Sequence, residues 1–195
     1  MQKEKKEMIG GGELISRLEF EKAWKKIKAK KAMDESEIRG EYVRALTEKG
    51  REKMREELNE VMIGGEVPED WRQSRVVLLE KGGDRRDLKN YRPVAIVNIM
   101  YKLMMMILKE RIEKWIAMKG LIGEEQGGFR KGKNTEDNLF IGQRLMEIAE
   151  GRGDNVLMAC IDLEKAYDRV DRNKLFEILE MSGINPDILR IVKFL

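Results

Sequence analysis

The side chains in this sequence that can carry chemistry are carboxylates, because its 195 residues include no histidine. That absence excludes Ser-His and Cys-His nucleophile pairs and every histidine-based metal site. Asp162 stands at the end of the apolar run Val156–Ile161, which is typical of a buried strand. A carboxylate at a strand tip can bind a hard divalent cation, and it can equally cap a turn. The local pattern leaves both interpretations open.

Two more acidic residues and the single cysteine lie close to Asp162. Asp168 and Asp171 are three residues apart and can cap the helix expected after them. Cys160 lies inside the apolar run, so we expect a buried core residue. As the only cysteine it cannot form an intrachain disulfide, which fits a reducing compartment.

Charge is distributed unevenly along the chain although the formal net charge is only +3. Residues 71–133 contain 15 Lys/Arg and 7 Asp/Glu, whereas residues 134–195 contain 8 and 12. A local excess of positive charge suits phosphate, and a local excess of carboxylates suits a cation. The middle of the chain is therefore the candidate for nucleic-acid contact, and the last third is the candidate for metal binding.

Two short strand candidates flank an exposed basic loop, Lys81–Arg92. Residues 75–80 form a β-branched and leucine run bounded by charge, which predicts a buried strand. Residues 93–97 predict a second strand, and Pro93 restricts it to a strand start or a sheet edge. The apolar run at residues 156–162 predicts a third, central strand.

The rest of the pattern is helical. Apolar residues recur at helical spacing, and helix start and stop signals flank them. The first expected helix ends at about residue 31, the second covers about 38–46, and the third contains 54–62 and stops at Gly64-Gly65. Four more helices are expected to begin at about residue 98, at 135, at about 171 and at 186, and the one from about 171 ends near 183.

Four blocks of the sequence resemble reverse transcriptases of non-LTR retrotransposons. Asp162–Val170 resembles their first catalytic motif, in which Asp-Leu-x-Lys-Ala-Phe/Tyr-Asp-x-Val is typical. Val67–Trp71, Val77–Asp84 and Asn90–Val94 follow the order and approximate spacing of the fingers motifs of the same family. Gln126–Asp137 is similar to its Gln-x-Gly-Phe-Arg-x-Gly-x-Ser-Thr-x-Asp segment. The shared order over roughly residues 67–183 makes coincidence a poor explanation.

The resemblance implies roles near the first catalytic motif. Asp162 corresponds to the first metal carboxylate, with the backbone carbonyl of Leu163 as a further ligand for Mg²⁺. Tyr167 corresponds to the aromatic residue that crowds the sugar 2′-position and favours deoxynucleotides. Its alternative reading is an ordinary buried aromatic.

The resemblance also implies contacts in the basic middle of the chain. Arg92 corresponds to the fingers arginine that grips the incoming triphosphate, with Lys81 as a helper, and both can instead be solvated loop charges. A template-contacting loop is implied, and its alternative is a plain connector between helices. The residues of that loop are Gly127, Gly128, Phe129 and Arg130.

The sequence departs from the family pattern at several points. Lys31–Ile38 stands where family members carry Lys-Ala-Pro-Gly-Pro-Asp-Gly-Ile, without the turn-forming Gly and Pro residues, and Asn134 replaces the usual serine. The later Gln-Gly motif, the paired-aspartate hairpin and the thumb are absent, and no Asp-Asp dipeptide occurs. Two-metal catalysis needs several carboxylates, so we expect the isolated chain to be inactive and truncated.

Taken with the resemblance, the expected fold class is α+β: the mostly helical fingers and partial palm of a right-hand polymerase. The expected domains are a helical extension with a charged tail at residues 1–66, fingers at 67–155 and the start of the palm at 156–195. The expected function is part of an RNA-directed DNA polymerase of a retrotransposon. The alternatives are a non-catalytic nucleic-acid-binding remnant and a degenerate relic.

The implied partners are an RNA template, a DNA primer, a deoxynucleotide and the missing C-terminal half of the polymerase. The N-terminus lacks the apolar segment of a signal peptide, and no apolar run approaches the roughly 20 residues of a membrane span. We therefore expect an intracellular protein without membrane contact, with nucleus and cytoplasm both open.

Overall fold

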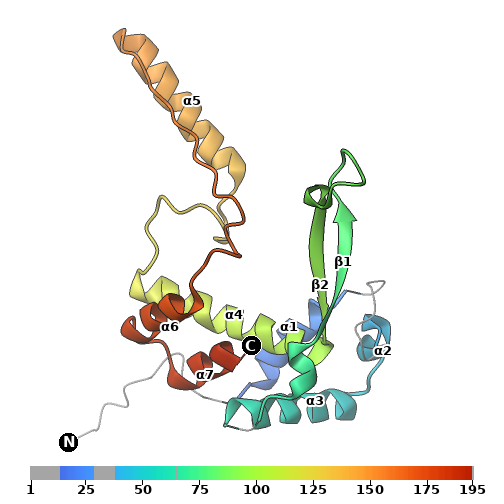
Figure 1. Ribbon diagram of the computed structural model, residues 1–195. Coiled ribbons are helices and arrows are strands. Elements are labelled where there is room, and N and C mark those ends of the chain that lie inside the picture. Colours follow the sequence, from blue (N-terminus) through green and yellow to red (C-terminus); the bar gives the residue numbers. More distant parts are fainter. Residues whose placement is uncertain (1–13, 29–37, 65, 195) are drawn as a thin grey trace, which may run out of the picture. The chain divides into compact units, whose positions relative to one another are not determined.

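The computed structural model describes residues 14–28, 38–64 and 66–194, which form helices and one antiparallel hairpin (Figure 1). They divide into two units. The first contains the chain up to Trp115 together with Asn173–Leu195, and the second is Ile116–Arg172. The expected α+β, mostly helical fold is confirmed. The three domains expected from the sequence, with boundaries after residues 66 and 155, stay a prediction.

Three helices open the first unit: α1 (Arg17–Lys25), α2 (Gly40–Arg44) and α3 (Glu48–Met62). α1 starts at a capping box, in which the Ser16 side chain accepts from the Glu19 N–H and the Glu19 carboxylate accepts from the Ser16 N–H. The helix was expected to reach about Lys31 and instead ends at Lys25. The segment Lys31–Ile38, which departs from the turn motif of the family, lies outside the described residues except for Ile38.

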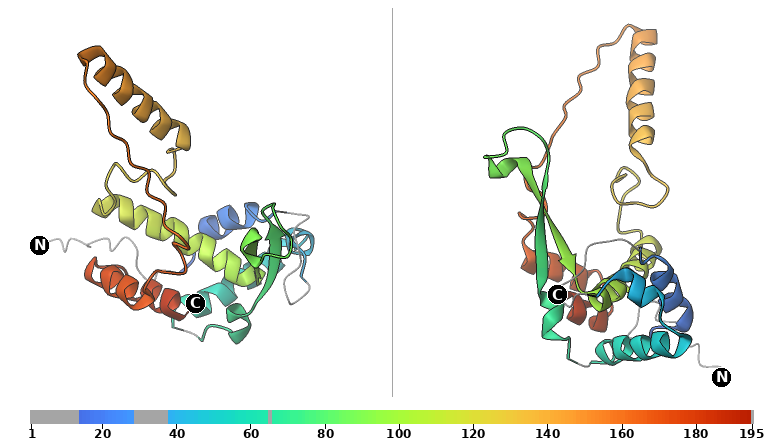
Figure 2. Two further views of the ribbon diagram at one scale, coloured as in Figure 1. Left: turned by 45° about the horizontal axis from the view of Figure 1, so that its top comes forward. Right: turned by 90° about the vertical axis from the view of Figure 1, so that its right-hand side faces the viewer.

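The two expected strands are confirmed as β1 (Ser74–Glu80) and β2 (Tyr91–Val97), which pair as an antiparallel hairpin after the short helix η1 (Glu69–Arg72). Leu79 lies opposite Arg92 and Leu78 lies opposite Pro93 in an antiparallel register. The expectation that the first strand is buried was wrong, because every residue of β1 is exposed. The sheet of the described residues has only two strands, and the hairpin projects from the helices, so both of its faces meet solvent in part (Figure 2).

The core of the first unit is built on α4 (Ile99–Lys119), whose side chains Leu103, Met104 and Leu108 are fully buried. Met105 and Met106, which follow Met104 in the chain, are half-buried. Two C-terminal helices, α6 (Arg172–Met181) and α7 (Pro186–Phe194), complete the fold, with α7 packed against α3. Arg190 of α7 donates to the Val61 carbonyl at 2.7 Å and so satisfies the C-terminal end of α3.

An ion pair joins α1 to α4. Arg111 Nε lies 2.8 Å from Glu19 Oε1, and both side chains are largely withdrawn from solvent. Burial raises the pKa of Glu19, but hydrogen bonds from Arg111 and Ser16 outweigh it and lower the pKa to about 2. The ionised carboxylate is therefore part of the folded state.

The second unit contains α5 (Thr135–Arg152), capped by reciprocal hydrogen bonds between Asn134 and Asp137. Asn134 in place of the usual serine is thus a working cap. Gly153 ends the helix in the left-handed conformation, with φ 71°.

The central strand expected at residues 156–162 is wrong for the described structure. Residues 154–163 are irregular, and Leu157 and Ile161 are 99% and 88% exposed. Cys160, expected in the core, is exposed as well. An apolar run becomes a strand only when another strand satisfies its N–H and C=O groups, and the described residues supply no such neighbour.

We predict that the Glu19–Arg111 pair makes stability depend on acid pH. Because folding lowers the Glu19 pKa from 4.5 to about 2, its contribution is present above pH 4.5 and disappears as pH falls towards 2. Urea unfolding followed by circular dichroism should show that Glu19→Gln lowers the midpoint at pH 7 and that this deficit closes below pH 3. Glu60→Gln, an exposed residue of α3, is the control. An equal deficit at pH 7 and pH 3 would contradict the assignment.

We also predict that the chain tolerates a polar side chain at Leu157. Because this side chain is exposed, Leu157→Gln should change the free energy of unfolding by less than about 0.5 kcal/mol. Leu108→Ala, in the fully buried core, should cost about 2–5 kcal/mol. Amides 156–162 should also exchange hydrogen rapidly. Slow exchange there would indicate a paired strand.

Candidate nucleic-acid interface

The hairpin of the first unit presents two of the expected site residues on one face. Arg92 lies opposite Leu79, so their side chains share a face, and Lys81 is two residues further along the chain from Leu79. The ladder continues to Lys81, whose N–H donates to the Asn90 carbonyl at 2.7 Å. Both cationic side chains are exposed, and Lys81 Nζ donates to the Lys89 carbonyl at 3.1 Å. The register therefore brings Lys81 and Arg92 together as diagonal neighbours.

The same face is apolar towards the base of the hairpin. Four of its side chains line a cavity of about 410 Å³, which Lys28 and Lys102 also line. They are Val77, Leu79, Val94 and Ile96. This cavity has no signal in the sequence, because its walls come from segments far apart in the chain.

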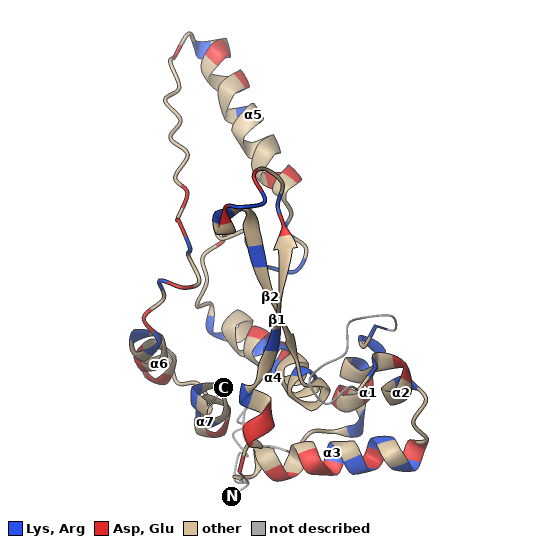
Figure 3. Ribbon diagram, turned by 45° about the vertical axis from the view of Figure 1, so that its right-hand side comes forward, with Lys and Arg blue, Asp and Glu red and all other residues tan. Residues whose placement is uncertain are grey.

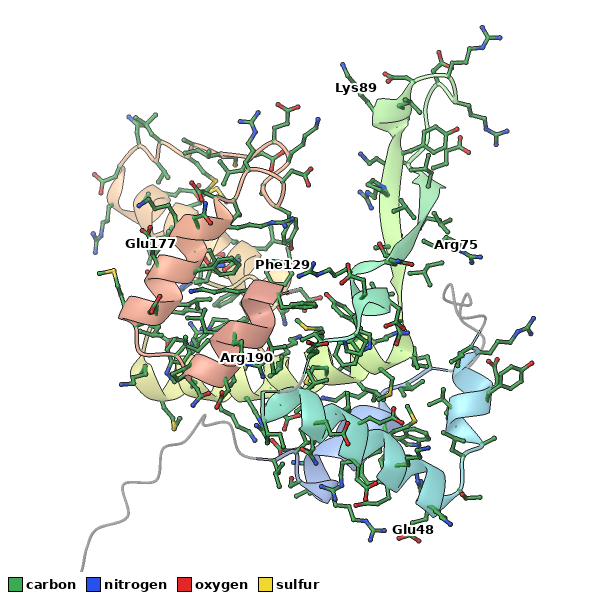
Figure 4. All side chains as sticks on the ribbon, turned by 60° about the horizontal axis from the view of Figure 1, so that its bottom comes forward. Glu48, Arg75, Lys89, Phe129, Glu177 and Arg190 are labelled. Carbon is green, nitrogen blue, oxygen red and sulfur yellow. The ribbon has the colours of Figure 1, made fainter. Side chains whose placement is uncertain are left out.

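The tip of the hairpin concentrates positive charge. Arg85, Arg86 and Lys89 lie in the loop between the strands and are exposed (Figure 3). Lys89 marks the tip and Arg75 the base of the hairpin in Figure 4. Three cations on a projecting loop form a surface that suits a phosphate backbone.

The glycine-rich loop of the second unit is held by hydrogen bonds from one of its own residues. The Arg130 guanidinium donates to the Gly123 carbonyl at 2.8 Å and pairs with Glu124 at 3.2 Å. The hydrogen bond from Arg130 holds the pKa of Glu124 below its ordinary value. Arg130 therefore fastens its own loop, which sequence reasoning missed.

Gly127 and Phe129 shape the same loop. A Cβ on Gly127 would approach Asn138 Nδ2 to 3.2 Å, so the glycine allows close approach to α5. For Gly128 the nearest atom is Gln126 Nε2 at 3.3 Å. Phe129 has a left-handed backbone, with φ 60°, and its side chain is 89% exposed. Its ring is open on most of its surface.

The structure brings Phe129 together with Tyr167. The two rings meet edge to face with centroids 6.2 Å apart, a favourable aromatic geometry. Tyr167 lies in the turn after Asp162 and is exposed, so the reading of a buried aromatic does not describe it. The four loop residues, Asp162, Leu163 and Tyr167 all belong to the second unit, whereas Lys81 and Arg92 belong to the first.

The metal donors expected from the sequence are suitable in kind and few in number. Asp162 and Leu163 lie in the exposed segment before the turn, and both offer the oxygen ligands that Mg²⁺ prefers. Within the described ranges, no three His, Cys, Asp or Glu side chains gather as a metal site. Asp162 and Leu163 supply some of the ligands that one hard cation needs. Within the described residues, they do not complete a two-metal centre.

Among the described helices, none combines the length and apolar character needed to cross a bilayer.

Comparison with known proteins gives a consistent result. A family model for reverse transcriptase (RNA-dependent DNA polymerase) matches residues 79–195. The "Transposon TX1 uncharacterized 149 kDa protein" of Xenopus laevis is 31% identical over 136 residues, 70% of this chain and 10% of that protein. A "Retrovirus-related Pol polyprotein from type-1 retrotransposable element R2" of Popillia japonica is 24% identical over 124 residues, 64% of this chain and 17% of that protein.

A third relative is the "Probable RNA-directed DNA polymerase from transposon BS" of Drosophila melanogaster. It is 21% identical over 105 residues, 53% of this chain and 12% of that protein. The chain thus spans between 10% and 17% of the length of these curated relatives.

Proposed function

Because this chain belongs to the reverse transcriptase family and its relatives are proteins of non-LTR retrotransposons, we propose that it supplies the nucleotide-binding hairpin and first metal-binding motif of such a polymerase. The observation that carries the proposal is the hairpin register, which puts Lys81 and Arg92 on one exposed face. Two cations on one face of the hairpin suit a triphosphate, and the planar guanidinium of Arg92 can bind two of its oxygens. The proposed ligand is an incoming deoxynucleotide.

The proposed nucleic-acid partners are an RNA template and a DNA primer. The exposed tip cations support contact with phosphate, and the open ring of Phe129 supports stacking on a base. Arg130 supports the proposed stacking contact by holding the loop that carries Phe129. Gly127 and Gly128 permit the tight path of that loop.

The proposed metal ligands are the Asp162 carboxylate and the Leu163 carbonyl. Mg²⁺ bound there would neutralise nucleotide phosphate charge, as is general for phosphoryl transfer. Asp162 would supply the negative charge that binds the ion, and Tyr167, five residues later, would face the sugar 2′-position. Completion of the centre requires carboxylates from further polypeptide, which we propose as the partner of this chain during catalysis.

A second candidate function is nucleic-acid binding without catalysis. The specific observation in its favour is the lone Asp162, since the described residues bring no second and third acidic side chain to it. Primer extension by a longer polymerase that contains this chain, with and without Asp162→Asn, separates the two candidates.

We predict that the chain binds RNA mainly through the hairpin and that the binding weakens with salt. The triple variant Arg75→Ala, Arg85→Ala, Arg86→Ala should flatten the slope of log affinity against log salt by about 2, at roughly 0.7 per lost contact with a single strand. Adding Arg130→Ala should change the slope little, because that guanidinium binds Gly123 and Glu124. Fluorescence anisotropy with a labelled oligonucleotide measures both effects.

The control for this measurement removes the same charge elsewhere. Arg44→Ala, Lys49→Ala, Lys53→Ala changes three exposed cations on or beside α2 and α3. Equal slopes for the control and the hairpin variant would reject the hairpin as the footprint.

We predict that Asp162 is required for DNA synthesis. The isolated chain should show no primer extension with Mg²⁺ or Mn²⁺, because one carboxylate cannot assemble two metals. In a longer polymerase containing this chain, Asp162→Asn should abolish extension, whereas Asp154→Asn, in the same exposed segment, should retain it. Tyr167→Ala should keep extension and relax selection against ribonucleotides, and Tyr167→Phe should keep the selection. Robust extension by Asp162→Asn would overturn the metal assignment.

A further inference from the structure

The loop at the hairpin tip is tightly hydrogen-bonded although it is exposed. Asp84 Oδ1 accepts from the Arg86 N–H at 3.0 Å, and Asp87 Oδ1 accepts from the Lys89 N–H at 2.9 Å. The Asp87 N–H in turn donates to the Asp84 carbonyl at 3.1 Å. These are aspartate turns, which give the loop local order. They do not by themselves connect the tip to the strands.

Two consecutive side chains make that connection: Asn90, the last residue of the short helix η2 (Leu88–Asn90), and Tyr91, the first residue of β2. Asn90 Nδ2 donates to the Asp84 carbonyl at 2.9 Å, and the Tyr91 hydroxyl donates to the Arg85 carbonyl at 3.1 Å. Both residues are half-buried, whereas residues 81–89 are all exposed. Two neighbouring carbonyls of the outgoing chain are thus held by two neighbouring side chains of the returning chain.

Gly83 makes room for this arrangement. Gly82 and Gly83 both have φ 99°, so a side chain at either position meets the same backbone strain. A Cβ on Gly83 would lie 3.0 Å from Asn90 Nδ2, whereas a Cβ on Gly82 would have nothing within 4 Å. Only the second glycine is needed for the approach of Asn90.

The bonds converge on the residues that carry the tip charge. The Arg85 carbonyl is bound by Tyr91, and Arg85 Nε pairs with Glu80 at 3.1 Å, yet 80% of its side chain is exposed. The Arg85 carbonyl and Nε are therefore held while most of the side chain stays accessible to solvent. Arg86 follows directly, with its own N–H bound to Asp84.

We propose that Asn90 and Tyr91 are positioning residues that preset Arg85 and Arg86 for the phosphate backbone of RNA. The proposal rests on the proposed function of the hairpin. A loop ordered before binding does not lose its freedom on binding, which strengthens the complex without adding a contact. The assignment gives the residues of Asn90–Pro93 different roles. Asn90 and Tyr91 hold the tip, and Arg92 stays accessible to a nucleotide. Pro93 lacks the N–H that an added strand needs.

The first test measures loop order in the 195-residue chain by hydrogen exchange and mass spectrometry. Tyr91→Phe removes a single oxygen and keeps the ring, and Asn90→Ala removes the other donor. Each should speed exchange of residues 82–89 several-fold and leave α3 and α4 unchanged. Gly83→Ala should act in the same direction and more strongly than Gly82→Ala. Unchanged exchange in both Tyr91→Phe and Asn90→Ala would overturn the proposal.

The second test measures affinity for a labelled single-stranded RNA by fluorescence anisotropy. Tyr91→Phe and Asn90→Ala should each weaken binding about three- to tenfold, the size expected from one lost hydrogen bond. The double variant should lose less than the product of the two, because both act on the same loop. Tyr42→Phe, an exposed tyrosine on α2, is the matched control and should bind like the original chain.

The two levels of the proposal fail in different ways. If Arg85→Ala, Arg86→Ala leaves RNA affinity unchanged, the tip does not contact RNA, and both the proposed RNA contact of the hairpin and this inference are overturned. If that variant weakens binding while Tyr91→Phe and Asn90→Ala speed exchange without weakening it, the positioning role alone is overturned. A thermal unfolding midpoint unchanged in Tyr91→Phe confirms that an affinity loss comes from the tip.

Discussion

Burial of the apolar sides of α1, α3, α4 and α7 is the constraint on which the rest of the first unit depends. An isolated two-stranded hairpin is marginally stable at best in water, so β1 and β2 need an anchor. Trp71, just before β1, and Ile99, just after β2, are both buried. The rings of Trp71 and of Tyr101 in α4 also meet edge to face, with their centroids 6.4 Å apart. The hairpin is therefore held at its base by the helical core and projects its tip into solvent.

The exposure of the hairpin explains how its charges can act. Cations held on a projecting loop keep their water until a ligand arrives, so each is a weak contributor to stability and a ready partner for phosphate. The disadvantage of such a projecting loop is that, without internal hydrogen bonds, it would be disordered in solution. Asn90, Tyr91, Asp84 and Asp87 offset that disadvantage with hydrogen bonds to the loop backbone.

The second unit, in contrast, has local order without burial of its side chains. Its helix α5 is well capped, yet it contains no buried residue, and the irregular segment after it is exposed along its whole length. Because they are exposed, apolar side chains such as Leu157 and Ile161 contribute no hydrophobic stabilisation. The aromatic contact of Phe129 with Tyr167 and the bonds of Arg130 are what order this unit near its loop.

Much of the structure was determined by the sequence alone. Helix starts at Ser16 and Asn134, the helix end at Gly153 and the hairpin with Pro93 on an open edge depend on short-range hydrogen bonds and backbone preferences, which neighbouring residues decide. The order of the motifs also predicted the family, and the comparisons confirmed that family.

Only the tertiary structure decided how exposed the apolar run Val156–Ile161 is, which groups the guanidinium of Arg130 binds, and which carbonyls Asn90 and Tyr91 bind. The physical reason is that burial, strand pairing and cross-loop hydrogen bonds each need a partner supplied from elsewhere in the chain. A local pattern describes the side chains that seek such a partner, and the folded chain determines whether they meet one.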